Sequence, residues 1–188
     1  MRGKQMNLLL TSAGFETEIL QNTFLSLINK APKDIHVIFV PTAAVNPDAI
    51  AVLPKCMNDL LKLNIPSANI YVYDLHTSMS IEDMQQYDAI YFCGGDTQYL
   101  LNRINEINYG CVLKQFLDNG GLFVGVSAGS IIAASNLPNN LGYVPCPISV
   151  HCNEGSPSGN LSINNCQLIK LTNSQALLIT EESFTIIE

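Results

Sequence analysis

The sequence predicts an α/β protein with a mostly parallel sheet, helices on both faces of the sheet, and a short β-rich part at the C-terminus. Short apolar runs alternate with longer amphipathic segments up to Ala134, which is the pattern of strand–helix–strand units. One of these runs, at residues 35–40, is continuously apolar, as expected of a strand that is covered on both faces. After Ala134 the last apolar runs have no helical segments between them.

The first two strand–helix units are expected within residues 7–63. Residues 7–10 form a strand that ends at the turn Thr11-Ser12-Ala13-Gly14, and a helix follows over residues 16–30. Residues 35–40 form the second strand, which ends at Pro41. Asp48 then begins a helix that runs to residue 63.

The remaining elements continue the alternation and then change character. Before Ala134, strands are expected at residues 69–73, 89–93 and 122–126, and helices at 97–105, 109–119 and 130–134. Towards the C-terminus, strands are expected at 167–171, 176–179 and 184–187, with a turn at Asn173-Ser174 between the first two.

The composition is that of a compact globular protein and excludes several classes of function. Hydrophobic residues make up 47% of the chain and charged residues 13%, which argues against disorder. The net charge of −7 and the lack of a basic run argue against a nucleic-acid partner. With no secretory signal and no apolar stretch long enough to span a membrane, we expect no membrane partner and a cytoplasmic location.

The six cysteines form neither a metal-binding nor a disulfide pattern. They contain no Cys-x-x-Cys pair, and without an export signal they are expected to be reduced thiols. Cys146 and Cys152 flank His151, but structural zinc sites usually show close pairs of ligands. We therefore expect neither a metal nor another cofactor.

Candidate functional turns follow Leu10, Val40, Cys93 and Val126, because parallel sheets place their sites at the carboxyl ends of the strands. The last of these turns carries the sequence Gly-Val-Ser-Ala-Gly, between an apolar run and a segment of small residues. A tight strand-to-helix turn can expose a serine hydroxyl beside a base and a helix N-terminus. Ser127 is therefore the candidate nucleophile, and a simple helix N-cap is the structural alternative.

A serine nucleophile needs a base, and the chain has three histidines. His36 lies at the start of a buried strand, where a structural role is favoured. His76 lies near the end of the third strand and stays open as an alternative. His151 follows a proline-rich loop downstream of Ser127 and is preferred, because loops hold catalytic groups more often than strand interiors do.

A catalytic serine and histidine usually have an acidic residue as third member of a triad, and the candidates for this acid can be reduced by elimination. Residues 128–150 contain no Asp or Glu, so the order serine, acid, histidine of ordinary α/β-hydrolases is excluded for Ser127 and His151. The acids after His151 are Glu154, Glu181, Glu182 and Glu188. Glu154 lies in a flexible loop, whereas Glu181 and Glu182 follow a strand, which is a more rigid place from which to orient an imidazole.

A glycine turn supplies candidate donors for an oxyanion. Gly94 and Gly95 connect the fourth strand to the helix at 97–105. Paired glycines can present backbone N–H groups to an anion. The alternative is a simple tight turn in which Asp96 caps the helix.

Together these residues resemble the peptidase E (aspartyl dipeptidase) and cyanophycinase family of serine peptidases. The resemblance extends from Leu8 to Ile187. It rests on Cys-Gly-Gly-Asp-Thr-Gln-Tyr-Leu-Leu at 93–101, Gly-Gly at 120–121, the serine turn at 125–130, and Ile-Ser-Val-His at 148–151. It implies a fold similar to class I glutamine amidotransferases, a single domain over residues 1–188, and a Ser-His-Glu triad.

The resemblance also implies roles for particular residues. Thr-Glu-Glu-Ser-Phe at 180–184 is similar to the segment that carries the glutamate of the family, and Glu181 is the better match. The implied triad is Ser127, His151 and Glu181, with an oxyanion hole from the backbone of Ala128 and of Gly95 or Gly94. The implied reaction is hydrolysis of short peptides through an acyl-enzyme.

Three departures from the family pattern bear on the site and the substrate. The segment between Ser127 and His151 is shorter than in peptidase E. The chain ends at Glu188, where the family usually continues into further strands, so a truncated chain and a short member both fit. The stretch after His151 lacks the arginine of aspartyl dipeptidases. Since an arginine fork suits a carboxylate, we expect no strong preference for an N-terminal aspartate.

Three functions follow from this reasoning. The leading one is a serine peptidase with a short peptide as substrate. The others are a non-catalytic relative that binds a small ligand or partner in the same pocket, and an esterase that uses the same triad. A homodimer is compatible with the sequence, which does not specify the oligomeric state.

Overall fold

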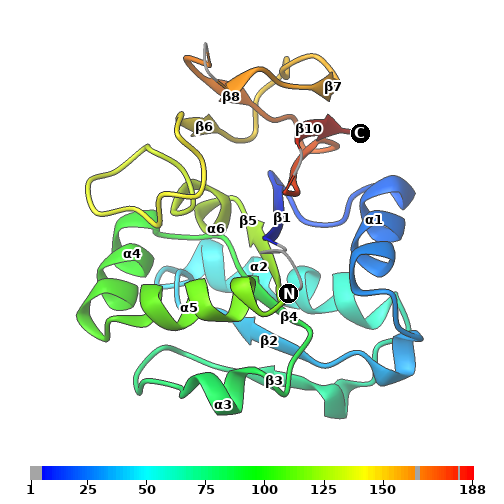
Figure 1. Cartoon of the computed structure of the whole chain (residues 1–188), viewed down its shortest axis with the longest axis vertical. Helices are drawn as coiled ribbons and strands as arrows, with labels where there is room; N and C mark the ends of the chain where they lie inside the picture. Colours follow the sequence, from blue (N-terminus) through cyan, green and yellow to red (C-terminus); the bar gives the residue numbers. More distant parts are fainter. Residues whose placement is uncertain (1–5, 164–165, 182) are drawn as a thin grey trace.

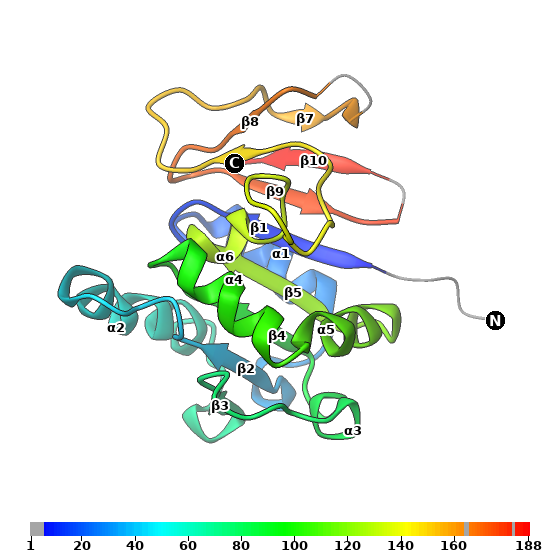
Figure 2. The same cartoon turned by 90° about the vertical axis from the view of Figure 1, so that its left-hand side faces the viewer.

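A mixed β-sheet organises the protein, whose structure is a computed structural model that describes residues 6–163, 166–181 and 183–188. Within these residues the sheet has eight strands in the order β3-β2-β4-β5-β1-β9-β10-β7. Its parallel part comprises β3 (Ile70–Val72), β2 (Val37–Val40), β4 (Ala89–Phe92), β5 (Leu122–Val126) and β1 (Asn7–Thr11). The antiparallel strands β9 (Ala176–Ile179), β10 (Phe184–Ile187) and β7 (Gly159–Asn160) continue it at the end opposite β3 (Figure 1, Figure 2). A separate parallel pair joins β6 (Ile148–Ser149) to β8 (Ile169–Lys170).

Helices cover both faces of the large sheet. α1 (Glu18–Ile28) and α2 (Pro47–Leu61) pack on one face, and α3 (Ile81–Met84), α4 (Thr97–Glu106), α5 (Tyr109–Asp118) and α6 (Ala128–Ile131) pack on the other. Alternate residues of β1 enter the two cores: Leu9 joins the core with α1 and α2, whereas Leu8 and Leu10 join the core with α4 and α5. Because both faces are covered, β1 has leucine on both of them.

Polar side chains cap the N-termini of three helices of the large sheet. Thr17, Asn46 and Asp96 cap α1, α2 and α4, and each accepts a hydrogen bond from an N–H in the first turn of its helix. These caps place the first turns of α2 and α4 at the carboxyl edge of the parallel strands, where the sequence predicts the functional turns.

The predicted fold class is confirmed: the sheet is mostly parallel, helices cover both faces, and the C-terminal part is a short antiparallel extension. The expected elements agree with the observed ones to within a few residues. α3, β6 and β7 are not expected from the sequence, because they are too short to leave a periodic pattern. The strand expected at 167–171 is reduced to β8, which pairs with β6.

The turn between β5 and α6 depends on glycine at two positions. A Cβ on Gly125 would lie 2.6 Å from the carbonyl carbon and oxygen of Gly129. A Cβ on Gly129 would lie 2.6 Å from the carbonyl oxygen of Phe92. The first turn of α6 therefore packs directly against the backbone of β5 and β4, without side chains between them.

We expect Gly125→Ala to lower the free energy of unfolding by about 2–3 kcal/mol, because the added methyl group must displace the backbone of α6. Urea denaturation followed by circular dichroism measures the change. Gly110→Ala in α5 is the control, since a Cβ there would meet its nearest neighbour, Leu141 Cδ2, at 3.7 Å. Its stability should stay the same or rise by up to about 1 kcal/mol. A Gly125→Ala variant as stable as the wild type would contradict the close packing.

Candidate active site

Ser127 lies at the apex of the turn between β5 and α6 in a strained backbone conformation. Its φ of 50° and ψ of −106° lie outside the regions that residues with a side chain normally adopt. Its N–H donates to Thr11 O at 3.0 Å. The buried hydroxyl of Ser130 lies 2.7 Å from Thr11 O and 2.9 Å from Gly125 O, so it ties the turn to β1 and β5. The neighbouring strands thus hold the turn in the strained form that is typical of a nucleophile turn.

His151 approaches the Ser127 hydroxyl from the loop that follows β6. Its Nε2 lies 3.1 Å from Ser127 Oγ, which is within hydrogen-bond distance. The N–H of His151 donates to Ser12 Oγ at 2.7 Å, so the loop is anchored to the turn after β1. His151 has a φ of 56°, in the left-handed region. The structure therefore brings together the serine and the histidine that the sequence analysis paired.

The other ring nitrogen of His151 contacts an amide and not a carboxylate. Asn173 Oδ1 lies 2.8 Å from His151 Nδ1 and also accepts a hydrogen bond from Ser12 Oγ at 3.2 Å. Since a carbonyl oxygen can only accept hydrogen bonds, the proton of the neutral ring lies on Nδ1. Nε2 is then unprotonated and accepts a hydrogen bond from the Ser127 hydroxyl. Asn173 thus selects the tautomer in which the imidazole can act as a base towards Ser127.

Glu181, the acid expected from the sequence, does not lie beside His151. β9 runs antiparallel to β1, and its first residue, Ala176, is opposite Thr11, the last residue of β1. The turn before β9, which holds Asn173, therefore lies at the carboxyl edge of the parallel strands. Glu181 follows the other end of β9, at the far edge, where it is exposed. The structure therefore does not bring Glu181 to His151, because the sequence pattern indicates the end of a strand but not the direction of that strand.

The other acids and histidines of the sequence analysis are not part of this arrangement. Glu154 is exposed in the loop after His151, Glu188 accepts a hydrogen bond from Gln175 at 2.9 Å, and Glu182 lies outside the described residues. His36 is exposed before β2, and His76 is exposed with its Nε2 3.8 Å from the Asp74 carboxylate. Among the described residues, these side chains make no hydrogen bond to Ser127 or His151.

Three backbone N–H groups close to Ser127 are candidate donors for an oxyanion. Ala128 begins α6, so its N–H has no partner within that helix. Gly95 has a φ of +139°, and a Cβ there would lie 2.1 Å from Ala43 O, so this position requires glycine. Within the described part of the chain, the N–H groups of Gly94, Gly95 and Ala128 donate to no protein acceptor, which leaves them available to an anion. Asp96 also caps α4, as the structural alternative for this turn predicts.

A cavity of about 450 Å³ opens beside Ser127 and is large enough for a small ligand. It is lined by the glycine turn, the Ser127 turn, His151, Asn173, the loop after β1 and the first half of α2. Lys55 and Glu16 lie in its wall and form an ion pair. Neither residue is expected in the site from the sequence, and neither is Asn173 as a partner of His151. Contacts between segments that are distant in the sequence bring Glu16, Lys55 and Asn173 to the site. A local pattern predicts the turn that holds Asn173, but not which residue this turn contacts.

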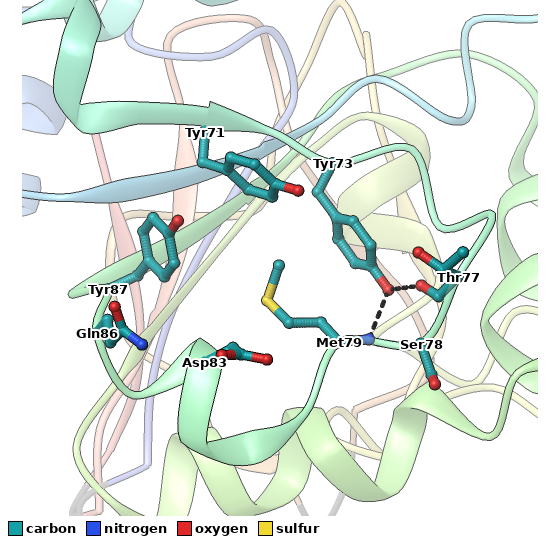
Figure 3. A pocket seen from close by; sticks show the side chains of 8 residues that line it. All are labelled: Tyr71, Tyr73, Thr77, Ser78, Met79, Asp83, Gln86 and Tyr87. Atoms are coloured by element: carbon teal, nitrogen blue, oxygen red, sulfur yellow. Dashed lines mark hydrogen bonds between the residues drawn. The ribbon is translucent and has the colours of Figure 1, made fainter.

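A second cavity of about 290 Å³ lies between β3 and α3, and Figure 3 shows three tyrosines around the side chain of Met79. The Tyr73 hydroxyl donates to Thr77 O and accepts from Met79 N–H. Burial raises the pKa of Tyr73 and of Tyr87, so both phenols stay neutral near pH 7. The residues that line this cavity include no histidine or cysteine. The Ser127 cavity, which has a serine and a histidine in hydrogen-bond contact, is therefore the better candidate for an active site.

Residues 6–163, 166–181 and 183–188 contain neither a metal-binding cluster nor a membrane-spanning helix. No group of three His, Cys, Asp or Glu side chains there is arranged to hold a metal ion. No helix in the same residues combines the length and the apolar character needed to cross a membrane.

We expect Asn173→Ala to remove the preference of the neutral His151 ring for the tautomer with its proton on Nδ1. In the wild-type protein at a pH where the ring is neutral, ¹⁵N chemical shifts of His151 should show a protonated Nδ1 and an unprotonated Nε2. In Asn173→Ala, the two shifts should move towards the average of a mixed population. Glu181→Gln is the control and should leave the shifts unchanged, because Glu181 lies at the other edge of the sheet. Shifts that respond to Glu181→Gln and not to Asn173→Ala would refute this geometry.

Comparisons with solved structures support the fold. A protein of Listeria monocytogenes EGD-e, described as a "putative peptidase E protein", matches with a TM-score of 0.73 at 20% sequence identity, over 98% of each chain. A peptidase from an acI-B1 Actinobacterium matches with a TM-score of 0.67 at 18% identity, over 98% of this chain and 88% of its own. At these identities the matches show a shared fold. No curated protein sequence matches the chain.

A comparison with family sequence profiles identifies the family. The profile of peptidase family S51 matches residues 8–142. The matched segment contains the glycine turn and the Ser127 turn, and it ends before His151 and Asn173. The resemblance expected from the sequence is therefore confirmed, and the chain belongs to peptidase family S51.

Proposed function

We propose that the protein is a serine peptidase that hydrolyses short peptides through an acyl-enzyme. The observation that carries the proposal is the pair of contacts on the ring of His151: Ser127 Oγ lies 3.1 Å from Nε2 and Asn173 Oδ1 lies 2.8 Å from Nδ1. Membership of family S51 supports a peptide as the substrate. The strained turn and the adjacent cavity support Ser127 as the nucleophile.

The proposed reaction uses the residues that face the cavity. Ser127 Oγ attacks the peptide carbonyl while His151 Nε2 accepts the hydroxyl proton. The N–H groups of Ala128 and of Gly95 or Gly94 stabilise the negative charge on the carbonyl oxygen. His151 then donates its proton to the leaving amine, which gives the acyl-enzyme. Water, activated by His151, attacks the acyl group and releases the acid product and free Ser127.

An amide in place of a carboxylate changes the contribution of the third residue. Asn173 can hold the imidazole in the required tautomer and orientation, as an asparagine does in papain-like cysteine proteases. A neutral amide adds little to the stability of the positively charged imidazolium that forms in the reaction. We therefore propose that Asn173 is a positioning residue and that orientation, not charge, is its main contribution. Ser12 supports it by donating to the same oxygen.

We expect Ser127→Ala to lower the turnover of a panel of dipeptides by at least about a thousandfold, because the reaction loses its nucleophile. Glu181→Gln should keep the wild-type rate, because the Glu181 side chain lies at the far edge of the sheet. Release of free amino groups measures the rate, and circular dichroism checks that both variants are folded.

The same assay separates the three functions that the sequence suggests. Turnover of p-nitrophenyl acetate without turnover of any peptide would indicate an esterase. No turnover of either substrate by the wild-type protein would indicate a non-catalytic relative. Wild-type turnover of dipeptides by Ser127→Ala would show that another residue is the nucleophile.

A further inference from the structure

An ion pair forms part of the wall of the Ser127 cavity. Lys55 projects from α2, and its Nζ is paired with the carboxylate of Glu16, which lies in the loop between β1 and α1. Both side chains line the cavity together with Ser127. They remain partly accessible, with 45% and 37% of their side-chain surfaces exposed. A substrate in the cavity would therefore meet both charges.

The pair is held in place by the structure beneath it. The buried Asp59, one helical turn after Lys55, accepts hydrogen bonds from Phe15 N–H at 3.0 Å and from the Tyr91 hydroxyl at 2.7 Å. Lys55 also donates to Ala13 O. These bonds fix the loop on both sides of Gly14 against α2. The backbone just before Glu16 is therefore held against α2, with the Glu16 carboxylate paired to Lys55.

The charge of Lys55 is already balanced before a substrate arrives. Burial alone would lower the pKa of Lys55, but its hydrogen bond to Glu16 and the nearby charge of Asp59 raise that pKa above its ordinary value. The ammonium is thus charged at neutral pH and bonded to a carboxylate. Asp48 adds a second carboxylate to the lining. Among the described lining residues there are two carboxylates, Glu16 and Asp48, and a single ammonium, Lys55, so an additional carboxylate would be repelled.

The rest of this wall is apolar. Ala49, Val52, Leu53 and Cys56 line the cavity and follow one another at the spacing of a single helix face of α2. Val52 is 49% exposed, so part of this apolar face is open to water. An apolar side chain of a substrate would cover this face and remove it from water.

We propose that this wall selects an uncharged, apolar side chain on the residue that supplies the scissile carbonyl, and that Glu16 excludes acidic side chains by neutralising Lys55. The inference rests on the proposed peptidase function and names its substrate class. It differs from recognition by an unpaired cation, which would attract a carboxylate. Removal of the Glu16 charge should convert Lys55 into such a cation.

The test compares kcat/KM for Leu-Leu and Asp-Leu, two dipeptides that differ only in the first residue. The wild-type protein should prefer Leu-Leu by at least about tenfold. In Glu16→Gln, the ratio of Asp-Leu to Leu-Leu should rise at least about fivefold, because Lys55 becomes free to pair with the substrate carboxylate. The ratio does not depend on the fraction of active protein, so it stays interpretable if the variant is less stable.

Two further variants identify the cause of the change. Glu16→Gln combined with Lys55→Met should lose the gain for Asp-Leu, since no ammonium remains. Glu18→Gln is the matched control: Glu18 is exposed in the first turn of α1 and lies outside the lining of the cavity, so its ratio should equal that of the wild type.

A wild-type preference for Asp-Leu, or a ratio unchanged in Glu16→Gln, would overturn the inference while leaving the peptidase function intact. No turnover of any dipeptide would overturn the peptidase function and this inference with it.

Discussion

The direct packing of α6 on the backbone of β5 and β4 is the contact on which the candidate site depends. Gly125 and Gly129 leave no room for side chains between these elements. The chain must therefore reverse within the single residue Ser127, which takes up the strain in its backbone. Within the residues that the structure describes, the N–H of the next residue, Ala128, has no protein acceptor. The proposed nucleophile and a proposed donor for an oxyanion thus arise from one packing constraint.

Ser12 joins the other parts of the site to this turn. Its hydroxyl accepts a hydrogen bond from the backbone of His151 and donates one to Asn173. Three segments that are distant in the sequence, the turn after β1, the loop after β6 and the turn before β9, therefore meet at one buried residue. The antiparallel direction of β9 makes this possible, because it returns the chain to the carboxyl edge of the parallel strands.

Local sequence patterns were sufficient for the fold class and for pairing Ser127 with His151, since apolar periodicity and a glycine-flanked serine are properties of short segments. The third residue could not be found in the same way. The elimination considered only carboxylates, whereas an amide can also orient an imidazole. The order and direction of β9 and β10 are set by long-range pairing, and they place Asn173 rather than Glu181 beside the ring. Glu16 and Lys55 were missed for a similar reason, because their contact joins a loop and a helix that are far apart in the sequence.

The central claim is that Ser127 is a nucleophile activated by His151 in the tautomer that Asn173 selects. The most direct measurement is the reaction of the protein with a fluorophosphonate, followed by mass spectrometry of the peptides. We expect a single phosphonyl group on Ser127, formed rapidly in the wild-type protein and in Glu181→Gln, and much more slowly in Asn173→Ala. A protein that is not labelled, or is labelled at a different serine, would contradict the account.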